Sequence, residues 1–138
     1  GMALVTVFEK VEKTGERKFG NLAIRDAILE EDYILATAVD KESKGFLLVL
    51  SRNDKDLNLI GTLDLPHNGT ALSATGKTVA AIGKDQSGKD MVTIIDVSSP
   101  STPRLITTLN VLEAASAVTI ASHIALVAGR GLELVDLG

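Results

Sequence analysis

The stretch Met91–Thr108, MVTIIDVSSPSTPRLITT, decides the fold class of this 138-residue chain. Two runs rich in β-forming residues, Val92–Val97 and Leu105–Thr108, flank a connector of Ser, Pro and Thr. Val, Ile and Thr favour strands, whereas Ser and Pro favour a turn. The stretch therefore predicts two adjacent strands joined by a loop, and other parts of the chain repeat this pattern less clearly.

The repeats have a period of about 45 residues. Three runs begin 45 residues apart: YILATA at Tyr33, TVAAIG at Thr78 and HIALVA at His123. Two more pairs are spaced by 46 and 40 residues: TLDL at Thr62 with TLNV at Thr108, and VTIID at Val92 with LELVD at Leu132. The shorter spacing reflects the tight turn over Gly129–Gly131. A period near 45 with four short strands is typical of propeller blades.

We therefore predict an all-β chain of about three four-stranded, propeller-like blades made of antiparallel sheets. Aromatic residues make up only 3% of the chain, so the core must be aliphatic. The predicted strands cover residues 4–10, 19–24, 27–29, 33–39, 46–50, 57–65, 70–74, 78–82, 92–97, 105–111, 117–120, 124–128 and 132–137. Asn110–Ala121 is the best helical candidate, but its alignment with 65–74 favours a loop and a strand.

These strands form one domain over residues 2–138. It contains N-terminal strands within 4–24, a repeat over 27–65, a second repeat over 70–111 and a partial repeat over 117–137. Gly1 precedes Met2 and is interpreted as an expression-tag scar, so it is left out of the fold prediction.

Met91–Leu109 resembles an LVIVD repeat, in which a strand ending in Val-Asp-Val-Ser is followed by a Pro-containing loop and a further strand. Asp96, Ser98, Pro100 and Pro103 match that pattern. Gly131–Leu137 matches its first half, and 48–63 is a degenerate copy. The resemblance implies propeller-like blades, and it implies neither an enzymatic activity nor a defined ligand.

Three blades are fewer than the four that a closed propeller typically needs. We expect two chains to close a six-bladed ring as a homodimer, with the N-terminal strands of one chain completing the C-terminal blade of the other. VTVFE at 5–9 aligns with VTIID at 92–96, which supports a strand there. The alternatives are a fragment of a longer propeller and an open or differently closed β-fold.

Composition excludes several classes of function. The chain has no cysteine, hence no disulfide and no thiolate metal site, and we expect a cytoplasmic location. The net charge of −4 includes no basic stripe, so nucleic acid is not an expected partner. The chain shows no signal peptide, and its longest uncharged run, 114–129, is shorter than the about 20 residues of a membrane-spanning helix. We expect no membrane association.

ALSATGKT at 71–78 fits a relaxed phosphate-loop pattern, and VTIID at 92–96 resembles a Mg²⁺-site strand that ends in Asp. A phosphate loop must lead into a helix whose N-terminus faces the phosphates. Gly83 and Gly88 interrupt the residues after Lys77 and leave no room for such a helix. A nucleotide-binding protein therefore remains only an alternative interpretation.

No residues are predicted to be catalytic, cofactor-binding or metal-binding, and no cofactor is expected. His67 and His123 stand alone, and Asp96 and Asp136 repeat in equivalent strands, which favours a structural hydrogen-bonding role. We expect any binding surface to use the loops 40–45, 83–90 and 129–131. The predicted function is a non-catalytic scaffold that binds proteins or ligands. An enzyme with a pocket on the axis of an assembled propeller is the second alternative.

Overall fold

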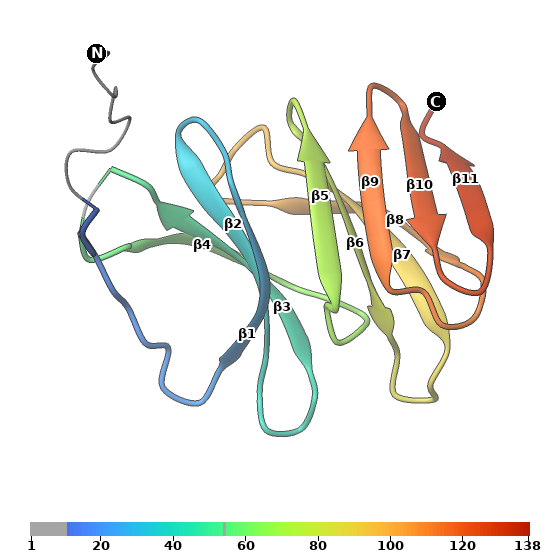
Figure 1. Cartoon of the computed structure of the whole chain (residues 1–138), viewed down its shortest axis with the longest axis horizontal. Helices are drawn as coiled ribbons and strands as arrows, with labels where there is room; N and C mark the ends of the chain where they lie inside the picture. The colour runs from blue at the N-terminus through green and yellow to red at the C-terminus, as the bar shows by residue number, and fades with distance from the viewer. Residues whose placement is uncertain (1–10, 54) are drawn as a thin grey trace, which may run out of the picture.

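The computed structural model describes residues 11–53 and 55–138, and these residues form eleven strands and no helix (Figure 1). All strand pairs are antiparallel, which confirms the predicted all-β class. Sheet A has the order β1-β2-β3-β4, sheet B has the order β5-β6-β7-β8, and sheet C has the order β9-β10-β11. The strands are β1 (Ala23–Leu29), β2 (Tyr33–Val39), β3 (Gly45–Ser51), β4 (Leu59–Asp64), β5 (Ala71–Thr75), β6 (Thr78–Lys84), β7 (Asp90–Asp96), β8 (Arg104–Asn110), β9 (Ala117–Ala121), β10 (Ile124–Ala128) and β11 (Leu132–Asp136).

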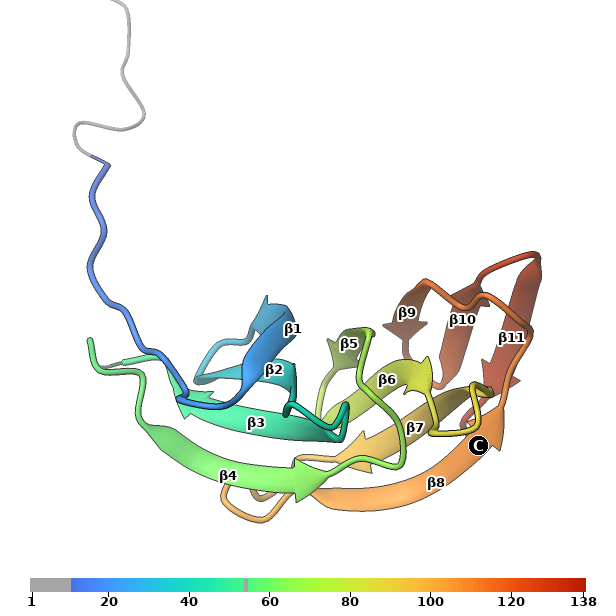
Figure 2. The same cartoon turned by 90° about the horizontal axis from the view of Figure 1, so that it is seen from below.

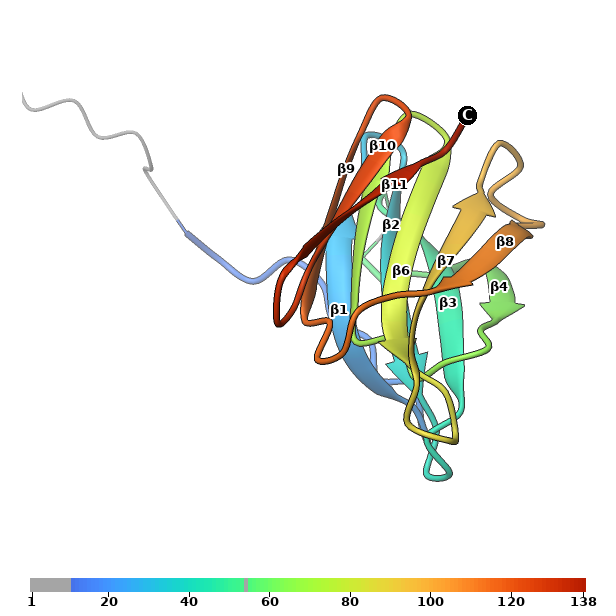
Figure 3. The same cartoon turned by 90° about the vertical axis from the view of Figure 1, so that its right-hand side faces the viewer.

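The three sheets follow one another along an arc (Figure 2). The first strands of the sheets, β1, β5 and β9, line its inner side, and β5 contacts both β1 and β9. The last strands of sheets A and B, β4 and β8, lie on the outer side. Seen from the end of the molecule that carries β11, the sheets lie one behind another (Figure 3).

Each pair of neighbouring sheets encloses an aliphatic core. Leu35, Leu47 and Val49 of sheet A pack with Val79 and Ile95 of sheet B. Each such side chain contributes about 1.5–3 kcal/mol when it is removed from water. Because sheet B lies in the middle, its central strands β6 and β7 are buried on both faces, in agreement with their apolar runs TVAAI and VTII.

The second core lies between sheets B and C. Sheet B contributes its other face, and sheet C contributes alternate residues of its three strands. The members are Ala80, Ile82, Val92 and Ile94 on sheet B, and Val118, Ile120, Ala125, Val127 and Val135 on sheet C.

Strand pairing corrects one sequence alignment. Tyr33 pairs with Ser51 and Thr78 pairs with Asp96, which confirms the 45-residue spacing of the first two repeats. In sheet C the residue that pairs with Asp136 is Ile124, so Thr78 is equivalent to Ile124 and not to His123. A shift of one residue moves a side chain to the other face of a sheet, so the third spacing is 46.

Most of the predicted strands are present, but the predicted strand over 19–24 is wrong. Residues 19–22 form a turn in which the Leu22 N–H donates to the Phe19 carbonyl, and β1 begins at Ala23 and includes the predicted strand 27–29. The predicted strand 4–10 lies outside the described residues. Residues 111–116 form a loop before β9, so the preference for a loop and a strand over a helix is confirmed.

Candidate functional site

The three loops that the sequence singled out lie along one edge of the stacked sheets, at the bottom of Figure 1. The connections between sheets reach the same edge. We call this edge the loop rim, and it consists of residues 40–45, 65–70, 84–90, 111–116 and 129–131. Hydrogen bonds join these segments, with the Asn68 N–H donating to the Lys84 carbonyl and the Arg130 N–H donating to that of Glu113.

Two turns of the rim have the same construction. The Asp40 carboxylate accepts the backbone N–H groups of Glu42 and Lys44, both at 2.9 Å. The Asp85 carboxylate, 45 residues later, accepts the N–H groups of Ser87 and Lys89 at 2.9 Å. These bonds, with that of Lys89 foremost, lower the pKa of the exposed Asp85 carboxyl. Both carboxylates are therefore used to shape a turn.

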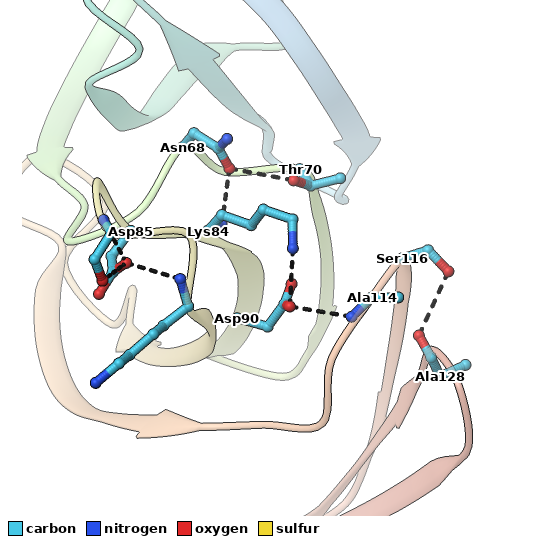
Figure 4. A network of polar contacts seen from close by, with 10 residues as sticks. Asn68, Thr70, Lys84, Asp85, Asp90, Ala114, Ser116 and Ala128 are labelled. Carbon is cyan, nitrogen blue, oxygen red and sulfur yellow. Dashed lines mark hydrogen bonds and ion pairs between the residues drawn. The ribbon is translucent and has the colours of Figure 1, made fainter.

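Asn68 joins sheets A and B at the rim (Figure 4). Its side-chain Oδ1 accepts the Lys84 N–H at 3.0 Å and lies 3.3 Å from the Thr70 hydroxyl. The loop that follows β4 is thereby fixed to the end of β6. Sequence reasoning missed this role of Asn68, because a bond to a residue 16 positions later leaves no local pattern.

Asp90 has the corresponding role between sheets B and C (Figure 4). Its Oδ2 lies 2.9 Å from Lys84 Nζ and accepts the Ala114 N–H at 3.0 Å. Its Oδ1 is buried and has no hydrogen-bond partner. Sequence reasoning missed the role of Asp90 because it is one of several charged residues in the loop 83–90.

His67 is a buried residue of the rim and is only 3% exposed. Its Nδ1 accepts the Gly69 N–H at 3.0 Å, and its Nε2 is buried without a partner. Desolvation lowers the pKa of His67 to about 4, so the imidazole is neutral at pH 7. The adjoining groove, between Ser43 and Gln86, measures about 90 Å³, well below the about 300 Å³ of a typical small-molecule site.

The other candidate residues are dispersed. His123 lies in the turn between β9 and β10, at the edge opposite the rim, where its Nδ1 is 3.1 Å from the Ser122 hydroxyl. Asp96 accepts the Ser98 N–H, and Asp136 accepts that of Gly138, which confirms the predicted structural role. Residues 71–84 form a β-hairpin, so no helix follows Lys77 as a phosphate loop requires.

Metal chemistry has no arranged ligand set in the part of the chain that the structure describes. No group of three or more His, Asp or Glu side chains is placed to hold an ion there. No helix among residues 11–53 and 55–138 is long and apolar enough to cross a membrane. Compared with known proteins, the chain matches no protein-family model and no curated protein sequence.

The second candidate surface is the outward face of sheet C, which we call the open face. Leu132 and Leu134 on β11 are each 71% exposed there. Leu134 pairs with Leu126, just as Ile94 pairs with Ala80 in sheet B. The face as a whole consists of Ala117, Thr119, Ala121, Ile124, Leu126, Ala128, Leu132, Leu134 and Asp136.

The open face is the repeat equivalent of a buried one. Leu132 and Leu134 correspond to Val92 and Ile94, which are 0% and 4% exposed because sheet C covers them. The outward side of sheet C therefore carries the same kind of aliphatic surface as the side of sheet B that sheet C covers. No further sheet of this chain's described residues covers it.

Proposed function

We propose that the chain is half of a six-bladed propeller, built from LVIVD-type repeats, that pairs with a second copy and serves as a non-catalytic binding scaffold. The equivalence of exposed Leu134 and buried Ile94 carries this proposal. Contiguous exposed apolar surface is uncommon on monomers and marks interaction sites. Because the exposed face is the repeat equivalent of a face that is buried within the chain, a second copy of the chain is the partner that carries a complementary surface.

The matching surface lies at the other end of the same chain. Leu72, Val79 and Ile95 of sheet B receive sheet A, and the equivalent side of sheet A carries Ala36 and Leu48, which are 1% and 2% exposed. Phe19, Leu22 and Phe46 pack against this cluster, so these partly buried side chains form the surface that a second copy would contact. A head-to-tail contact between the open face and this end, made twice around a two-fold axis, closes a ring.

The loop rim is the proposed binding surface of the assembled ring. Its turns are fixed by Asp40 and Asp85, and the connections between sheets are fixed by Asn68 and Asp90. A surface fixed in this way loses little conformational entropy when a partner binds. Because the carboxylates are engaged with backbone N–H groups, the rim supports recognition better than acid–base chemistry.

Light scattering on a sizing column tests the assembly. The intact chain should elute with twice the mass of 14.5 kDa. Leu134→Lys places a charge in the proposed interface and should give a monomer. Ile106→Lys is the matched control, because Ile106 on β8 is 52% exposed and lies outside the open face. A monomeric wild-type protein, or a dimer unaffected by Leu134→Lys, would contradict the proposal.

A further inference from the structure

Among the described residues, sheet C lacks a strand that the other two sheets have. Sheets A and B end in β4 and β8, which pair with β3 and β7. Sheet C ends at β11, which is equivalent to β7 and has no partner among the described residues on its outer side. An edge strand with free N–H and C=O groups is a template for pairing with another chain.

The two outer strands share a sequence pattern. β4 begins LIGTLD at 59–64, and β8 contains LITTLN at 105–110. Both strands also have an irregular register one residue into that run, at Ile60 and at Ile106. The pattern is Leu, a β-branched residue, a small residue, a β-branched residue, a larger apolar residue and an acidic or amide residue.

The N-terminal segment LVTVFE at 4–9 fits this pattern at every position, with Thr6 as the small residue. Thr6 coincides with Thr107 of β8, and Phe8 coincides with Leu109. The segment therefore has the chemistry of an outer, fourth strand. Its earlier alignment with 92–96 would instead make it a copy of β7, a position that β11 already fills in sheet C.

We infer that residues 4–10 of a second copy add to β11 as the fourth, antiparallel strand of sheet C. The register follows from sheet B, where Val92 pairs with Leu109 and Ile94 with Thr107. By equivalence Phe8 of the second copy lies opposite Leu132, and Thr6 lies opposite Leu134. This inference rests on the proposed dimer and specifies how its two halves are joined.

The course of the chain favours a second copy as the donor. Residues 11–22 lie at the sheet A end of the molecule, and β11 lies at the opposite end of its longest axis (Figure 1). Phe19 precedes Leu65 by 46 residues. Leu65 lies in the core between sheets A and B, and Phe19 packs against Ala36, Ala38 and Leu48 on the other side of sheet A. Residues 19–22 therefore take the place of a connection from an outer strand to the first strand of the next sheet.

A cysteine pair tests the register, because the natural chain contains no cysteine. Facing residues on antiparallel strands have Cα atoms about 4.5–5.5 Å apart, within disulfide range. Phe8→Cys combined with Leu132→Cys should give a covalent dimer on a non-reducing gel. Val7→Cys combined with Leu132→Cys is the matched control, since Val7 points to the other face, and should give little.

Deletion of residues 2–10 tests the contribution of the strand. The dissociation constant of the shortened chain's dimer should be at least 10-fold higher than that of the intact chain, as measured by light scattering over a dilution series. A dimer that survives deletion unchanged overturns strand exchange and leaves the head-to-tail dimer standing. An intact chain that is monomeric overturns both. A cysteine pair that links within one chain overturns strand exchange alone.

Discussion

Lys84 Nζ lies 2.9 Å from Asp90 Oδ2, and the two residues face each other at the ends of β6 and β7. The Asp90 side chain is 4% exposed and that of Lys84 is 49% exposed. The same Asp90 oxygen accepts the backbone N–H of Ala114, in the loop that leads to sheet C. One carboxylate therefore holds the strand pair of sheet B to the connection with the next sheet.

Asp90→Ala should lower the free energy of unfolding by about 1–3 kcal/mol, because the Ala114 N–H loses its acceptor in a part-buried hydrogen bond. Asp90→Asn keeps an acceptor oxygen and should cost less. Lys84→Met should also be destabilising, since it leaves the buried Asp90 carboxylate without its counter-charge. Urea unfolding measures all three, with Lys41→Ala in an exposed turn as the control. Equal losses for Asp90→Asn and Asp90→Ala would show that charge, and not the hydrogen bond, is what matters.

Acidification should destabilise the protein through His67. Burial lowers its pKa from 6.5 to about 4, so between these values the unfolded chain binds a proton that the native chain does not. The contribution of neutral His67 to the free energy of unfolding is therefore fully present above pH 6.5. It is lost as the pH falls towards 4, by up to about 3 kcal/mol. The pKa of Asp85 is itself lowered from 3.8, so its own effect falls below this window.

His67→Asn separates the titration from the hydrogen bond. Its Oδ1 can replace Nδ1 as the acceptor for the Gly69 N–H, and it carries no proton in this pH range. Urea unfolding at pH 7.5, 6.0 and 4.5 should show a steep loss for the wild type and a shallower one for the variant. Parallel losses in the two proteins would show that another group controls acid stability.

Gly83→Ala should destabilise the junction between sheets A and B. A Cβ atom at Gly83 would lie 2.5 Å from His67 Nδ1 and 2.6 Å from the Gly69 nitrogen, so the loop would have to move. We expect a loss of about 1–3 kcal/mol, as for overpacked cores. Gly131→Ala is the control, because the nearest atom, a Leu112 methyl carbon, is 3.7 Å away. Similar melting temperatures for the two variants would contradict the close approach.

The sequence predicted the strands well because each sheet repeats a local pattern of β-branched residues and turns. It misplaced the third repeat by one residue, since HIALVA matches TVAAIG by composition and only the pairing of Ile124 with Asp136 sets the register. It also predicted a strand at 19–24, where Phe19 instead closes a turn. The rim contacts of Asn68 and Asp90 could not be predicted, because they join residues 16 and 24 positions apart.

The turn between β9 and β10 offers a test of the corrected register. Ser122 has φ 55°, and the equivalent residue between β5 and β6 is Gly76, with φ 57°. A residue with a Cβ atom is strained at positive φ, whereas glycine is not. Ser122→Gly should therefore raise the free energy of unfolding by about 0.5–1 kcal/mol, and Gly76→Ser should lower it by a similar amount. Thermal unfolding of the two variants measures both shifts, and destabilisation by Ser122→Gly would show that its hydroxyl contact with His123 outweighs the backbone strain.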